Sequence, residues 1–181
     1  MLLVSYSGSA LSDCFRSATQ VAIKYGDKRV LDEEISLEVE ELLTRGDQIS
    51  EVLGGLIIQK KDISFQDMKS AHRAFNKYFG IEIEKDERVN NIILGQACRH
   101  VIVHEGAKVN ARILKQVSGA KPRKLKEVLK ESEQLNFTVD EIEMLGSYMK
   151  GYVSDLEKKI LIYHDLLQAR EQPENQQGQS H

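Results

Sequence analysis

The chain has 181 residues, which is enough for one domain with a substantial core. Its 41% hydrophobic and 29% charged residues are typical of a folded water-soluble protein, and the net charge of −3 gives no support to a dedicated nucleic-acid binder. Cys14 and Cys98 form neither a metal-binding pattern nor a disulfide framework, and we find no secretion signal or membrane span, so we expect a cytoplasmic protein with no membrane partner.

Apolar residues at helical spacing predict an all-α fold. This spacing recurs in every long segment, and only Pro122 and Pro173 interrupt the chain. The first helix is expected to begin almost at residue 1 and to end at Gly26. Its apolar positions step by three, four and seven residues: Val4, Leu11, Phe15, Ala18, Ala22 and Tyr25.

The next segments predict shorter helices. A second helical segment is expected before Gly46, with apolar residues Ile35, Val39, Leu42 and Leu43. Residues 51–59 indicate a helix weakened by two glycines, with a strand as the alternative. Ser64, with Asp67 three residues later, is an acceptable N-cap for a helix that ends at Gly80. That helix carries Met68, Ala71, Phe75 and Tyr78.

Residues 86–105 predict one helix with ionisable side chains on or beside its apolar stripe. With Val89 at 0°, the stripe continues through Ile93 at about 40°, Ala97 at about 80° and Val101 at about 120°. His100 and His104 fall inside it at about 20° and about 60°, and Arg99 lies about 140° from His104. Unpaired burial of such groups costs several kcal/mol. Either each has a polar partner in the core, or the stripe lines a cleft or subunit contact that water can enter.

Charge is uneven along the chain. Residues 32–51 hold eight acidic residues against one basic residue, and residues 108–130 hold eight basic residues against one acidic residue. Such runs are usually solvated faces. The basic run, however, follows directly after residues 99–104, so its members are candidate phosphate contacts: Lys108, Arg112, Lys115, Lys121, Arg123 and Lys124.

The longest predicted helix begins at a capping box formed by Thr138 and Glu141. Its apolar residues have a period of roughly 3.5, as in a helical bundle or at a helical dimer contact. They are Ile142, Leu145, Met149, Tyr152, Leu156, Ile160, Tyr163 and Leu167. We therefore expect one helical domain over residues 1–170 and a disordered polar tail over residues 171–181.

His100 and His104 have two plain interpretations. A histidine on an apolar face is more often a core residue with a satisfied hydrogen bond than a functional group. His100 and His104 could also hold a metal at i and i+4, but the residues between them are aliphatic, where zincin patterns carry a glutamate. P-loop, dinucleotide-binding and nucleophile-elbow motifs are absent from the sequence, so we expect neither a metal nor another cofactor.

The stretch "RHVIVHEGAKVN" (99–110) resembles the signature of HEPN domains, in which an arginine is followed by a polar residue, three variable residues and a histidine. Arg99, His100 and His104 match that order without a gap. The flanking residues 75–86 and 138–160 are similar to HEPN proteins of the RiboL-PSP type, and the likeness runs from the first helix to about residue 168. Relatives often have asparagine after the histidine, where this chain has Glu105, an acid that repels phosphate.

The resemblance implies a helical bundle that forms a homodimer, with two motifs in a shared cleft, and a metal-independent endoribonuclease. The ribose 2′-hydroxyl would attack, leaving a 2′,3′-cyclic phosphate. His104 would be the general base or acid. Arg99 would hold the phosphate and stabilise the transition state, and His100 would orient a partner or supply a second proton-transfer group. The alternative is a non-catalytic HEPN dimer that binds RNA or protein. Either suits a toxin–antitoxin or phage-defence system with an antitoxin or regulatory partner.

Overall fold

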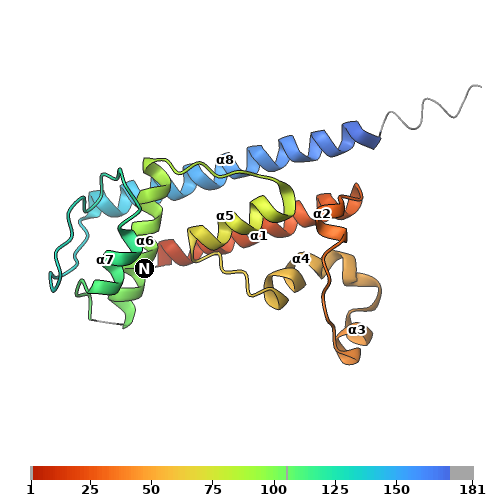
Figure 1. Ribbon diagram of the computed structural model, residues 1–181, viewed down its shortest axis with the longest axis horizontal. Helices are drawn as coiled ribbons and strands as arrows, with labels where there is room; N and C mark the ends of the chain where they lie inside the picture. Colours follow the sequence, from red (N-terminus) through yellow and green to blue (C-terminus); the bar gives the residue numbers. More distant parts are fainter. Residues whose placement is uncertain (1, 105, 172–181) are drawn as a thin grey trace, which may run out of the picture.

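Figure 1 shows the computed structural model of the protein, which describes residues 2–104 and 106–171. Its helices are α1 (Leu2–Lys24), α2 (Lys28–Leu31), α3 (Val39–Arg45), the 3-10 turn η1 (Gly46–Gln48), α4 (Ile49–Lys60), α5 (Met68–Phe79), α6 (Glu87–His104), α7 (Ala111–Val117) and α8 (Val139–Glu171). Within these two ranges there is no strand, only a bridge between Lys108 and Gln134. The predicted all-α fold is confirmed. The side chains of Arg45, Asp47 and His104 and the predicted tail beyond Glu171 lie outside the description.

The central helix is α1, which contacts α2, α4, α5, α6 and α8. Figure 1 shows α1 and α8 starting at the same end of the molecule and running along its long axis. α6 lies across that end, where it packs against both α7 and α8. The first residues of α1 and α8 therefore lie close to the last turns of α6.

The core is organised by an aromatic cluster around Phe15 of α1. The Phe15 ring lies 5.0 Å from that of Phe79 and 5.4 Å from that of Tyr78, both on α5, in edge-on geometry. Phe79 in turn lies 5.6 Å from Tyr163 of α8. Such pairs contribute about 0.5–1.5 kcal/mol each beyond the burial of their surface. The cluster thus joins α1, α5 and α8 into the unit that supports α6.

Residues 51–59 form a helix within α4, as predicted, and the strand alternative is wrong. One of the two glycines is required by packing, because a Cβ at Gly54 would lie 2.9 Å from the Cα of Arg16 on α1. At Gly55 the nearest atom to such a Cβ, the Nε of Arg16, is 3.9 Å away. Gly54 therefore allows the close approach of α4 to α1, and Gly55 does not serve that purpose.

The helix ends agree with the predicted signals except at one N-terminus. The Thr138 amide donates to Glu141 Oε2 at 2.9 Å and the Glu141 amide donates to Thr138 Oγ1 at 3.2 Å, which confirms the capping box of α8. α5 ends at Gly80, whose φ of 66° is left-handed. Its cap, however, is Asp67, which accepts from the Lys69 amide at 3.0 Å, and not Ser64. The residue after Ser64 is buried in the core, which holds residues 64–66 off the helix.

The apolar seam of α8 is internal. It is buried from Leu145 to Leu167, where α8 packs on α1 and α6, whereas Ile142 is 50% exposed. The seam therefore serves the bundle of a single chain.

Residues 32–51 differ most from expectation. α3 spans only Val39–Arg45, and Val39, Leu42 and Leu43 are exposed rather than buried. The short helix α2 was not anticipated by the apolar pattern, because its four residues are too few to show a period.

Candidate functional site

The candidate site begins where α6 leaves the core. Residues 89–98 are all buried, so this part of the helix is enclosed on every side. Arg99 and His100 are half-buried, and Val103 is 51% exposed. The motif, which we define as residues 99–104, thus starts at the rim of the bundle. There Arg99 and His100 keep access to water and escape the several kcal/mol that full burial of an unpaired ionised group costs.

Arg99 is held by a neutral partner. One of its terminal guanidinium nitrogens donates to Gln66 Oε1 at 3.1 Å, and Gln66 is an exposed residue just before α5. No carboxylate of the described residues forms an ion pair with Arg99. Among the described residues its positive charge is therefore oriented without an ion pair, which suits an anion-binding arginine. Gln66 was not singled out from the sequence, since nothing in the local pattern relates it to residue 99.

His100 faces a second arginine. The Nε2 of His100 lies 3.3 Å from a terminal nitrogen of Arg112, on α7. A guanidinium has only donors, so in this contact the Nε2 of His100 is the acceptor. α7 is placed there by a tight reversal after α6, in which Gly106 (φ 64°) and Ala107 (φ 59°) are left-handed and the Ala107 amide donates to the Val101 carbonyl at 3.1 Å.

His104, the residue to which the resemblance assigns proton transfer, has a described backbone in the last turn of α6, but its side chain lies outside the description, and so does all of Glu105. Because the helix is continuous through residue 104, the Arg99 and His104 positions differ by about 140° around the axis and by about 7.5 Å along it.

Arg99 also lines a mostly apolar hollow of about 280 Å³, which we call the Arg99 hollow. Its walls come from the start of α1, the end of α6, residues 135–137 and the start of α8, and include Leu3, Gly95, Ile102, Phe137 and Ile142. Cys98 lies in it too, but burial raises the pKa of this thiol to about 12. The thiol is therefore protonated at neutral pH and unsuited to act as a nucleophile.

The basic run at 108–130 does not form one surface. Lys108, Arg112 and Lys115 are exposed at the end of α6 that carries the motif. The segment with Lys121 and Lys124 is tied instead to the beginning of α6 by hydrogen bonds: Asn90 Nδ2 donates to the Pro122 carbonyl at 2.9 Å, Asn91 Oδ1 accepts from the Leu125 amide at 2.9 Å, and Lys124 Nζ lies 3.4 Å from Glu87. Arg112 therefore lies at the last turns of α6 and Lys124 at its first turn.

Arg123 does not belong to a phosphate-binding surface, contrary to the prediction. It is 7% exposed, and its guanidinium donates to the backbone carbonyls of Val117, Ala120, Lys126 and Glu127 at 2.9–3.3 Å. Burial lowers the pKa of this group below its usual value. Its donors are engaged in holding residues 117–127 together, so no free edge remains for a phosphate.

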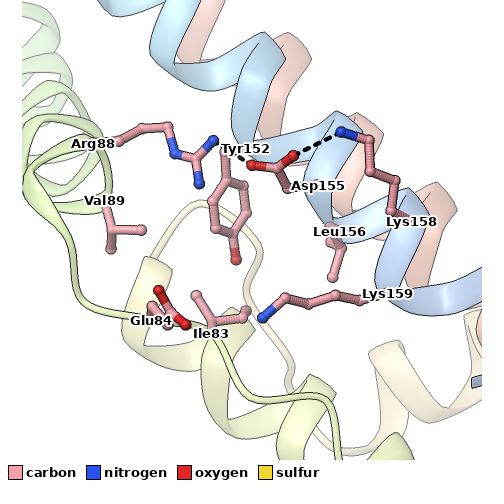
Figure 2. Close-up of a pocket in the computed structure, with 9 residues that line it drawn as sticks. All are labelled: Ile83, Glu84, Arg88, Val89, Tyr152, Asp155, Leu156, Lys158 and Lys159. Atoms are coloured by element: carbon pink, nitrogen blue, oxygen red, sulfur yellow. Dashed lines mark hydrogen bonds and ion pairs between the residues drawn. The ribbon is translucent and has the colours of Figure 1, made fainter. Parts of the chain in front are cut away.

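Figure 2 shows a separate hollow of about 280 Å³ between α6 and α8, the Arg88 hollow. Arg88 and Lys158 both point to Asp155, at 2.6 Å and 3.1 Å, and Lys159 Nζ donates to the Glu82 carbonyl at 2.7 Å. The charges here are compensated by one another. This network fastens α6 to α8 and offers no excess charge to a ligand.

Comparison with protein-family models, with curated proteins and with solved structures finds no match for this chain. Within the described residues no group of three or more His, Cys, Asp and Glu side chains is placed to hold a metal ion. No helix in the described part of the chain is both long enough and apolar enough to cross a bilayer.

Proposed function

We propose that the protein is a metal-independent endoribonuclease of the HEPN type, acting as a toxin or phage-defence effector. The observation that carries the proposal is the arrangement at the end of α6. There Arg99 emerges from the core, held by Gln66 and free of any carboxylate among the described residues, beside His100 and the exposed Arg112.

The proposed reaction uses the RNA itself as nucleophile. His104 takes the proton of the ribose 2′-hydroxyl, whose oxygen attacks the adjacent phosphorus. The bond from phosphorus to the 5′-oxygen breaks, leaving a 2′,3′-cyclic phosphate, and the 5′-oxygen takes a proton from His100 or from the partner's His104. Arg99 stabilises the additional negative charge of the transition state.

The proposal includes a homodimer in which two motifs share a cleft. Apolar side chains are exposed around the Arg99 hollow, at the starts of α1 and α8 and the end of α6: Leu2, Tyr6, Val103, Val139 and Ile142. Exposed apolar surface of this kind is typical of an interaction site. The dimer also relieves the separation of Arg99 and His104 around α6, because each site then draws residues from both copies.

Incubation with RNA in EDTA tests the proposal. The wild-type protein is expected to cleave and to leave a 2′,3′-cyclic phosphate, and sedimentation at micromolar concentration is expected to report a dimer. Arg99→Ala and His104→Ala should each lower the cleavage rate by roughly 10²–10⁴-fold, the usual effect of losing one catalytic group.

Arg170→Ala and His164→Ala are the matched controls, since both side chains lie on the last turns of α8, away from α6. Cleavage that requires a divalent ion, or that survives both motif substitutions, contradicts the mechanism. A folded dimer that binds RNA without cutting it identifies the non-catalytic module. Glu105→Asn, which removes an acid next to the motif, is expected to maintain or raise the rate.

A further inference from the structure

A second region of positive charge lies beside the motif, on helices that the basic run does not include. We define the basic groove as the hollow of about 320 Å³ between the first turns of α5 and the first half of α6. Its cations are Lys69, His72 when protonated, Arg73 and Lys85. Counts of charge along the chain miss it, because Glu82, Glu84 and Asp86 surround Lys85 in sequence.

The cations of the groove are available to a ligand. Lys69, Arg73 and Lys85 are exposed, and none of them forms an ion pair within the described ranges. The one acid in the groove is Asp67, whose Oδ1 accepts from the Lys69 amide at 3.0 Å as the cap of α5. In the Arg88 hollow, on the other side of Ile83 and Val89, the cations are instead ion-paired: Arg88 with Asp86 and Asp155, and Lys158 with Asp155.

The shape of the groove suits a strand of phosphates. Its floor is apolar and barely exposed, formed by Met68, Ile83, Val89 and Ile93. Lys69 and Arg73 are four residues apart on α5, so they project from the same face of the helix and line one wall. A nucleic-acid strand can place its phosphates along such a basic wall and a base over the apolar floor.

One end of the groove lies close to Arg99. Asp67, at its end, is bonded through the backbone to Gln66, and Gln66 accepts the hydrogen bond of Arg99. On the same turn, the Met68 amide donates to Gln96 Oε1 at 2.9 Å, which fixes α5 against α6 one turn before Arg99. The groove is therefore near enough to Arg99 for one RNA strand to contact both.

We infer that the basic groove binds the phosphates of single-stranded RNA next to the scissile phosphate and sets how the substrate lies across Arg99. The choice of RNA as ligand rests on the proposed function. The groove acts through charge, so its contribution to binding depends on salt. Each phosphate contact of a single strand adds about 0.7 to the slope of log K against log salt concentration.

Fluorescence anisotropy with a short 2′-O-methyl oligoribonucleotide tests the inference, because that strand lacks the attacking hydroxyl and binding is read without cleavage. Lys69→Gln/Arg73→Gln is expected to bind roughly tenfold more weakly at low salt and to lower the slope of log K against log salt by about 1.4. Lys28→Gln/Lys150→Gln removes the same charge from exposed lysines elsewhere and should leave both quantities unchanged.

The RNA-binding role of the groove is wrong if the wild-type protein does not bind the oligonucleotide, or if both double variants lose the same amount of binding. The proposed function is judged separately, by cleavage of unmodified RNA. If cleavage is absent but Lys69→Gln/Arg73→Gln alone loses binding, the ribonuclease proposal is wrong and the RNA-binding role of the groove is supported. If cleavage occurs and Lys69→Gln/Arg73→Gln binds as the wild type does, the RNA-binding role is wrong and the ribonuclease proposal is supported. All substituted positions are exposed and keep a polar side chain, and circular dichroism of each variant checks that it is folded.

Discussion

Two tyrosines of α8 carry buried hydroxyls in opposite situations. The Tyr163 hydroxyl donates to Asp27 Oδ2 at 2.6 Å, whereas the Tyr152 hydroxyl has no hydrogen-bond partner among the described residues. Burial raises the pKa of both groups. Tyr152→Phe is therefore expected to leave the free energy of unfolding unchanged or to raise it by about 1 kcal/mol, since a buried donor without an acceptor is removed.

Tyr163→Phe is the matched substitution with the opposite sign. It removes a hydrogen bond to a charged carboxylate and is expected to lower stability by about 1.5–3 kcal/mol. Urea unfolding measures both variants. Equal losses of stability would mean that the Tyr152 hydroxyl has an acceptor after all.

Single residues show where sequence reasoning reaches its limit. Helical phase placed His100 inside the apolar stripe and Arg99 beside it, and both are half-buried at the rim of the core. The sequence pattern could not predict that Arg112 is exposed beside His100 whereas Arg123 is buried among backbone carbonyls. Both arginines belong to one basic run, and their burial differs because the carbonyls that bind Arg123 come together only in the folded segment around it.

At the scale of helices, the contact of α4 with α1 depends on one missing side chain. Gly54→Ala places a Cβ 2.9 Å from the Cα of Arg16, a backbone atom that cannot move aside, and is expected to destabilise the protein by about 1–3 kcal/mol. Gly55→Ala meets only a flexible side-chain atom at 3.9 Å and should stabilise α4 by about 0.5–1 kcal/mol. Thermal unfolding of the two variants compares them directly, and a stabilising Gly54→Ala would contradict the close approach.

Helices with a clear period were predictable and short ones were not. α1, α5, α6 and α8 bury one stripe or more, so the positions of their apolar residues record the packing. α3 packs little of its apolar surface: Leu42 and Leu43 fit the apolar pattern of a helix, but both are exposed to solvent. The N-cap at Asp67 depended on Phe65 turning into the core, which is a tertiary contact that no local signal announces.

For the molecule as a whole, Glu33 ties together three segments that are distant in sequence. It lies between α2 and α3 and pairs with Lys61, after α4, at 2.7 Å and with Lys77 of α5. The hydrogen bonds of Lys61, and then of Lys77, lower the pKa of Glu33 from 4.5 to about 2. A carboxyl whose pKa is lower in the folded state than in the unfolded state stabilises the fold at pH values above its unfolded pKa. This stability is lost as the pH falls from 4.5 towards 2.

Glu33→Gln is accordingly expected to lower the melting temperature at neutral pH, and the difference from wild type should shrink as the pH falls from 4.5 towards 2. Glu34→Gln removes the same charge from an exposed neighbour with no ion pair in the described part of the chain. Calorimetry over this pH range measures both. A constant difference for Glu33→Gln, or an equal pH dependence in Glu34→Gln, contradicts the role of the ion pairs.

The common starting end of α1 and α8 governs how the protein can be handled. Leu3 and Val4 line the Arg99 hollow, so a fusion partner or affinity tag placed before Leu2 would stand over the motif and over the apolar surface around it. α8 leaves the hollow at Leu145 and ends at Glu171, about 40 Å further along its axis. A fluorophore or immobilisation handle attached after Glu171 is thereby held at a distance from the motif by a single stiff helix, and surface-bound protein presents its candidate site to the solution.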